Sequence, residues 1–174
     1  MTPDEAAAAL IATPGDLDET VAGLPGAPGL YAWWTTVPLG LGGAVHDGRT
    51  LLDVGAARML RNRVRRQDLY RTGVSRLRRV LAGLLLDDLS LAPTWAADVV
   101  LPKADEERLT GWMRERVLLT ALPDDDAADL VGPVAARLGE TAMASEAAAR
   151  AEERFVAAPG AKPVRPAGEV FRRP

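Results

Sequence analysis

The stretch Gly29-Leu30-Tyr31-Ala32-Trp33-Trp34 opens a segment, Leu30 to Val37, whose aromatic and β-branched residues predict a β-strand. A second strand is expected over Thr50 to Val54, and the two strands most simply pair antiparallel. After them the chain reads Arg58-Met59-Leu60-Arg61-Asn62-Arg63-Val64-Arg65-Arg66-Gln67, and the spacing predicts a helix over 57–70. Two strands followed by an arginine-rich helix therefore form the centre of the expected fold.

The rest of the chain adds helices and short strands around this centre. Helices are expected over 3–12, 75–89, 105–116, 124–138 and 146–158, and strands over 94–101 and 117–122. Gly132-Pro133 should kink the 124–138 helix or restart it. The sum is an α+β domain, a small and mostly antiparallel sheet flanked by helices. Its expected parts are 1–28 (N-terminal helix and loop), 29–144 (main domain), 145–158 (C-terminal helix) and 159–174 (flexible tail).

Composition excludes several classes of site. The 174 residues suffice for one domain with a core, and 48% of them are apolar. The absence of cysteine excludes disulfides and thiolate metal sites, and the one histidine, His46, is expected at the surface of a polar loop. The chain has no apolar run of about 18 residues and lacks the basic start of a signal peptide. A cytoplasmic protein without a membrane segment is therefore expected.

Charge is distributed unevenly, although the net charge is only −3. The segment from Arg58 to Arg79 holds nine arginines and a single acid, Asp68. Clustered arginine is the electrostatic footprint expected for a polyphosphate partner such as nucleic acid. A solvated helix surface is the alternative interpretation of the same pattern.

The order of these segments resembles the core of the GIY-YIG nuclease superfamily, most closely its stand-alone bacterial members. The likeness runs from about Gly29 to Leu138 and includes Pro28-Gly29-Leu30-Tyr31-Ala32-Trp33-Trp34, the Val54-Gly55 pair and Glu107-Arg108-Leu109-Thr110-Gly111-Trp112-Met113-Arg114-Glu115. The resemblance implies a GIY-YIG-like fold for residues 29–144 and the chemistry of an endonuclease, a hydrolase acting on DNA. Because one fold supports many functions, the substrate stays open.

The resemblance places Tyr31 and Arg63 in a catalytic cleft. It implies that Tyr31 helps to activate the attacking water and that Arg63 contacts the scissile phosphate, a role that suits a planar and permanently charged guanidinium. On the expected helix, Leu60, Val64 and Gln67 share one face with Arg63 at its edge, so Gln67 needs a polar partner. The alternatives are that Tyr31 packs as an ordinary sheet residue beside Trp33 and that Arg63 is a surface arginine.

Two departures from the family pattern make cleavage doubtful. Asp53 stands where the family usually has tyrosine, and it is expected across from Tyr31. Asp53 is either a relocated ligand for Mg²⁺ or Mn²⁺ and thus a third catalytic residue, or the partner of Arg63 in a salt bridge. The metal-binding glutamate of the family's late helix is replaced by Pro133, which removes charge neutralisation at the phosphate. No metal ligand is otherwise identified.

The expected function is that of a diverged GIY-YIG endonuclease-like protein that binds DNA through its arginine-rich helix. Mg²⁺ or Mn²⁺ would be needed only if it cuts. The residues expected to bind nucleic acid are Arg58, Arg61, Arg65, Arg66 and Arg71. The alternative is a non-catalytic scaffold that meets a protein partner through its C-terminal helix and tail.

Overall fold

The computed structural model describes residues 1–12 and 14–162. Its strands form two sheets: β1 (Gly29–Thr35), β2 (Val45–His46), β3 (Arg49–Ala57) and β6 (Val117–Pro123) in one, β4 (Thr94–Trp95) and β5 (Val99–Val100) in the other. The α-helices are α1 (Pro3–Ile11), α2 (Leu17–Gly23), α3 (Arg76–Leu84), α4 (Lys103–Arg116), α5 (Ala127–Leu138) and α6 (Glu146–Ala157). Shorter turns of other helix types are η1 (Asn62–Asp68), η2 (Thr72–Val74) and η3 (Ala142–Ala144).

The main sheet is antiparallel, with strand order β2-β3-β1-β6. β1 lies between β3 and β6, and all seven of its residues are buried. This central place explains its aromatic composition, since a strand covered on both faces needs large apolar side chains on both. The α+β class, with a mostly antiparallel sheet flanked by helices, is confirmed.

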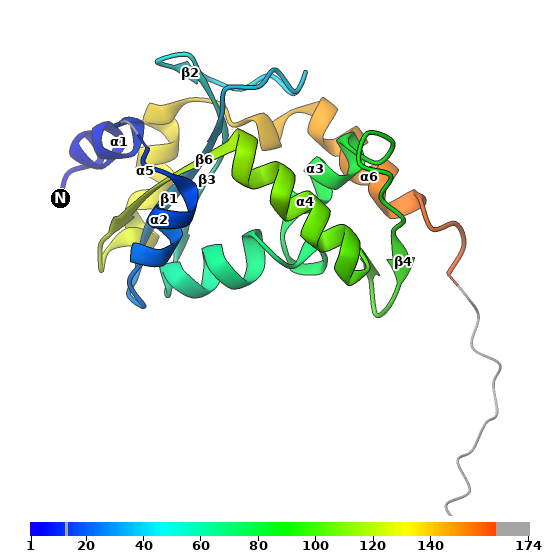
Figure 1. Ribbon diagram of the computed structural model, residues 1–174. Coiled ribbons are helices and arrows are strands. Elements are labelled where there is room, and N and C mark those ends of the chain that lie inside the picture. The colour runs from blue at the N-terminus through cyan, green and yellow to red at the C-terminus, as the bar shows by residue number, and fades with distance from the viewer. Residues whose placement is uncertain (13, 163–174) are drawn as a thin grey trace, which may run out of the picture.

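Side-chain alternation along β1 divides the interior into two cores. Tyr31 and Trp33 face a larger core that includes side chains from η1, α3, α4 and α6. Leu30, Ala32 and Trp34 face a smaller core closed by α1 and α5. Figure 1 shows α1 and α5 on one side of the sheet and α3, α4 and α6 on the other. The face that carries Tyr31 is therefore remote from α5.

Several local predictions were wrong. The predicted 57–70 helix begins later, because β3 stays extended and paired with β1 through Ala57, and most of the predicted helical segment is the π-helical η1. Instead of one strand over 94–101, β4 and β5 form a short hairpin closed by the Ala96 N–H, which donates to the Asp98 carbonyl. α3 ends at Leu84, whereas the helix predicted over 75–89 extends to residue 89.

The first and last helices of the described residues, α1 and α6, are both capped and pack on other helices. Thr2 and Glu5 form a capping box on α1, which packs on α5, and the Ser145 hydroxyl caps α6 by accepting from the Ala148 N–H at 3.1 Å. On α6, Phe155 and its buried neighbours pack against α3. Most of the predicted tail, residues 163–174, lies outside the described residues. Among the residues that the structure describes, no helix is long and apolar enough to cross a membrane.

Two expectations concern the α5 end of the domain. α5 is a single helix with Pro133 inside it, so of the two alternatives, a kink or a restart, the restart does not occur. His46 is not a free surface histidine, because it lies in β2 with its Nε2 2.7 Å from the Leu138 carbonyl and its ring edge-on to Trp34. It therefore holds the C-terminus of α5 against the edge of the sheet.

Candidate functional site

Tyr31 lies against a glycine on the neighbouring strand. It pairs with Gly55 of β3, and the Tyr31 hydroxyl crosses the space that a side chain at position 55 would occupy: a Cβ there would lie 2.6 Å from the hydroxyl oxygen. Gly55 thus explains why the ring can lie across β3 and reach η1. The Gly55 of the Val54-Gly55 pair thus has a direct structural function at this place.

Arg63 reaches Tyr31 from η1. Its Nε donates to the Tyr31 hydroxyl at 3.0 Å, its Nη1 donates to Gln67 Oε1 at 3.1 Å, and its guanidinium carbon lies 5.8 Å from the centre of the Tyr31 ring. The side chain is 30% exposed, as expected for the edge of the buried stripe. The structure therefore brings Tyr31 and Arg63 together and supplies the partner that Gln67 needs.

Asp68 is the counter-charge of Arg63. Its carboxylate lies 3.2 Å from Arg63 Nε, accepts from the Ser75 hydroxyl at 2.8 Å and from Trp33 Nε1 at 3.4 Å, and its side chain is only 1% exposed. Hydrogen bonds in a π-helix run from i to i+5, so the helical backbone itself places residues 63 and 68 one turn apart. Burial raises the pKa of the Asp68 carboxyl, while Arg63 lowers it.

The predicted position and partner of Asp53 were wrong. Asp53 pairs with Trp33 of β1 and not with Tyr31, and the register of the two strands shifts between Trp33 and Trp34. Arg63 forms its ion pair with Asp68, and no Asp53–Arg63 salt bridge occurs in the described structure. Asp53 is partly buried on the same face as Tyr31, and burial, together with the charge of Asp68, raises its pKa to about 6.

Arg63 keeps one nitrogen for a ligand. Nε and Nη1 are engaged, whereas Nη2 donates to no side chain or carbonyl within residues 1–12 and 14–162. No buried side-chain nitrogen or oxygen of that part of the chain lacks a partner, so Nη2 is in contact with solvent. Tyr31 is a neutral neighbour, because burial raises the pKa of its phenol. The group available to an anion at this place is therefore Arg63 Nη2, beside the neutral Tyr31 hydroxyl.

The residues around Tyr31 do not fit a divalent cation. Asp68 is already bonded to Arg63, Ser75 and Trp33, which leaves Asp53 as the nearest carboxylate. No group of three or more His, Asp or Glu side chains in the described residues could hold a metal ion. α5, which holds Pro133 and the residues where the resemblance expects a metal ligand, covers the opposite face of the sheet.

The exposed arginines of η1 and its flanks form what we call the arginine surface: Arg58, Arg61, Arg65, Arg66 and Arg71. Of these, Arg61 donates its Nε to the Leu24 carbonyl at 2.8 Å, and the other four side chains make no ion pair or hydrogen bond with the described residues. The arginine surface therefore carries uncompensated positive charge next to Arg63.

Other arginines of the same segment have structural functions. Arg78 is fully buried, with its Nη2 2.6 Å from a Glu106 carboxylate oxygen and its Nη1 donating to the Leu69 carbonyl. Arg76 and Arg79 both pair with Glu152 of α6. The count of arginines in the sequence thus overstates the charge available to a partner.

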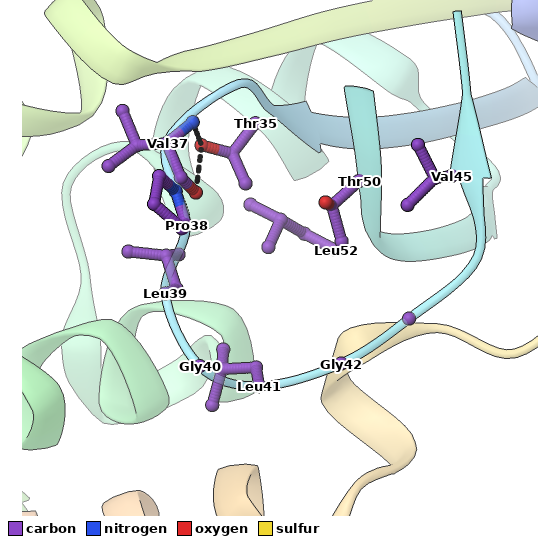
Figure 2. A pocket seen from close by; sticks show the side chains of 11 residues that line it. Thr35, Val37, Pro38, Leu39, Gly40, Leu41, Gly42, Val45, Thr50 and Leu52 are labelled. Atoms are coloured by element: carbon purple, nitrogen blue, oxygen red, sulfur yellow. Dashed lines mark hydrogen bonds between the residues drawn. The ribbon is translucent and has the colours of Figure 1, made fainter. Parts of the chain in front are cut away.

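A separate apolar pocket lies beside the sheet, enclosed by the loop between β1 and β2 (Figure 2). It has a volume of about 220 Å³, and no charged side chain lines it. Its lining residues are Thr35, Val37, Pro38, Leu39, Gly40, Leu41, Gly42, Gly43, Val45, Thr50 and Leu52. Because no cationic side chain lines it, this pocket is distinct in chemistry from the Arg63 site.

Comparisons of the chain with models of protein families, with curated proteins and with solved structures find no significant match. The GIY-YIG resemblance accordingly rests on the sequence stretches that carry it, such as Gly29-Leu30-Tyr31 and Val54-Gly55.

Proposed function

We propose that this chain is a diverged GIY-YIG-like protein that binds DNA through the arginine surface and receives a backbone phosphate at Arg63. The observation that carries the proposal is the position of four unpaired exposed arginines beside a fifth, Arg63, whose Nη2 is free within the described part of the chain. Guanidinium groups are preferred for phosphate because their planar fork matches two phosphate oxygens. Because the net charge of the whole chain is −3, a positively charged surface arises only where arginines are clustered locally.

The arrangement of strands supports the resemblance on which the proposal depends. The strand with the expected tyrosine lies at the centre, the strand with Val54-Gly55 pairs with it, and the arginine-bearing segment comes directly after. The late strand β6 pairs with the other side of β1 and leads into α5. This order brings Tyr31 and Arg63 together, which agrees with the phosphate site that the resemblance implies.

The chemistry of the site favours binding over hydrolysis. Tyr31 stays protonated because of its raised pKa, so it acts as a hydrogen-bond donor and not as a general base. Metal-assisted cleavage needs charge neutralisation by carboxylate-bound cations, and the donor set around Tyr31 in the described residues does not provide it. We expect no nicking of supercoiled plasmid with Mg²⁺ or Mn²⁺.

A protein-interaction scaffold is the second candidate. This candidate is favoured by the ion pair between Arg63 and Asp68. Because Asp68 already neutralises the charge of Arg63, the role of Arg63 in folding would be complete without a phosphate ligand. In that case an Arg63 substitution would alter stability alone. The apolar face of α6 already packs on α3, so a partner would have to use its exposed side.

Fluorescence anisotropy with a labelled DNA duplex tests the proposal. The double variant Arg65→Ala/Arg66→Ala should bind at least about tenfold more weakly than wild type at low salt, because two phosphate contacts are lost. The matched control is Arg137→Ala/Arg150→Ala, which removes the same charge from α5 and α6 and should bind like wild type. Equal weakening by both double variants would show that only net charge matters and would refute a defined surface.

A further inference from the structure

An exposed tyrosine lies within the arginine surface. Tyr70 comes just after η1, is 42% exposed, and lines a hollow of about 370 Å³ together with Arg65, Arg66 and Arg71. The hollow is thus lined by one tyrosine and three arginines, and those three arginines make no ion pair with the described residues. Neither the resemblance nor the proposed phosphate site at Arg63 uses this ring.

A second hollow adjoins the first. It has a volume of about 360 Å³ and is also lined by Tyr70 and Arg71, with the β4–β5 hairpin on its far side. The hairpin contributes the small side chains Ala96 and Ala97 and the carboxylate of Asp98. Glu106 of α4 lines this second hollow as well. Tyr70 therefore stands between a hollow lined by three arginines and one lined by small apolar side chains and two acids.

The Tyr70 ring is held in place at its outer end. Its hydroxyl accepts a hydrogen bond from Arg114 Nη2 of α4 at 2.8 Å. The chain just beyond it is fixed as well, since the Arg71 N–H donates to the Gln67 carbonyl at 3.0 Å. A ring fixed at both ends loses little conformational entropy when a planar group stacks on it.

We propose that Tyr70 is a stacking platform for an unpaired nucleobase, and that Arg65, Arg66 and Arg71 hold the phosphates on either side of that base. The ligand class is single-stranded nucleic acid, because base pairing and stacking in a duplex cover the faces that Tyr70 would contact. Aromatic rings set in a cationic groove are the general means of binding single strands. An acidic peptide would use the same arginines but has no need of the ring. The inference rests on the proposed function and deepens it.

The test compares a fluorescein-labelled DNA strand of about 12 nucleotides, within the site sizes usual for such grooves, with the duplex of the same sequence by anisotropy. Tyr70→Ala should weaken binding of the single strand about 5- to 150-fold and leave duplex binding unchanged. Tyr70→Phe keeps the ring and should retain most of the affinity. Val45→Ala, which alters an exposed apolar residue of β2 outside both hollows, is the control and should bind like wild type.

A second readout locates the contact. Ultraviolet crosslinking of the same labelled strand, followed by peptide mass spectrometry, should place a crosslink on Tyr70. Polyglutamate should compete weakly and with no dependence on Tyr70. The inference is overturned if Tyr70→Ala binds the single strand like wild type, or if polyglutamate shows the same Tyr70 dependence.

The two proposals fail differently. If duplex binding depends on Arg65 and Arg66 while Tyr70→Ala changes nothing, the stacking platform is refuted and the arginine surface stands. If neither duplex nor single strand binds wild type at low salt, the proposed function itself is refuted. Unchanged circular dichroism of Tyr70→Ala, expected for an exposed side chain, excludes misfolding as the cause of lost binding.

Discussion

Removal of Arg63 should reveal the buried charge of Asp68. In the variant Arg63→Ala, the Asp68 carboxylate keeps only two neutral donors among the described residues, the Ser75 hydroxyl and Trp33 Nε1. Its side chain is 1% exposed, so water cannot replace the lost guanidinium without rearrangement. The variant should therefore be less stable than wild type for an electrostatic reason, independent of any ligand.

The size of the effect depends on burial. Breaking a fully buried ion pair from one side costs about 3–5 kcal/mol. Because the Arg63 side chain is 30% exposed, solvent can enter the space it leaves, and we expect a loss of about 2–3 kcal/mol at pH 8. The double variant Arg63→Ala/Asp68→Asn carries no unpaired charge and should recover at least about 1 kcal/mol of that, roughly half of the loss.

The effect should also depend on pH. Without Arg63 the pKa of Asp68, already raised by burial, rises further, since Arg63 acts to lower it. A carboxyl with a raised folded-state pKa contributes stability below its unfolded pKa, and that contribution is lost as the pH rises through the folded value. Arg63→Ala should thus be closer to wild type at pH 5 than at pH 8.

Equilibrium urea unfolding measures all of these quantities. Trp33 and Trp34 are fully buried, so tryptophan fluorescence reports the transition. Two outcomes contradict the reasoning: an Arg63→Ala variant within about 0.5 kcal/mol of wild type at pH 8, or a double variant no more stable than Arg63→Ala, either of which means that Asp68 is not held by Arg63.

Three other substitutions test neighbouring features. Asp53→Asn should stabilise the protein above pH 6 by at most about 3 kcal/mol and leave its stability unchanged below pH 4, because the folded-state pKa of Asp53, about 6, exceeds the ordinary 3.8. A stability difference from wild type that does not change with pH in urea unfolding would contradict this prediction. Gly55→Ala should push the Tyr31 hydroxyl away from Arg63 and cost about 1 kcal/mol of stability, seen as a lower urea midpoint. Gly83→Ala should lower the melting temperature strongly, since the new Cβ would lie 1.8 Å from the Ala151 carbonyl oxygen where α3 and α6 cross. Overpacking of this kind costs about 1–3 kcal/mol or more, so an unchanged melting temperature would refute that crossing.

Local chemistry accounts for the features that could be predicted from the sequence. The strand at Gly29-Leu30-Tyr31 results from its aromatic and β-branched composition, and the edge position of Arg63 results from the spacing of Leu60 and Val64. The short helix α2 was missed, although its signal is present: Asp16 caps it by accepting from the Glu19 N–H, a pattern that marks helix starts.

The remainder depends on contacts between distant residues. Asp68 looks like the lone acid of a basic segment, and its burial arises only because Trp33 and Ser75 close over it. Arg78 looks like one more surface charge until Glu106 of α4 is brought beside it. A helical periodicity of 3.6 residues does not predict the π-helical η1, whose i to i+5 bonding places Asp68 one turn from Arg63.

The salt dependence of duplex DNA binding tests directly whether the arginine surface binds DNA. Each phosphate contact adds about −0.9 to the slope of log K against log salt on duplex DNA. For Arg65→Ala/Arg66→Ala the slope should be shallower than wild type by about 1.8, whereas Arg137→Ala/Arg150→Ala should keep the wild-type slope. The same slope in wild type and Arg65→Ala/Arg66→Ala, or no binding by wild type even at low salt, would contradict a DNA-binding arginine surface.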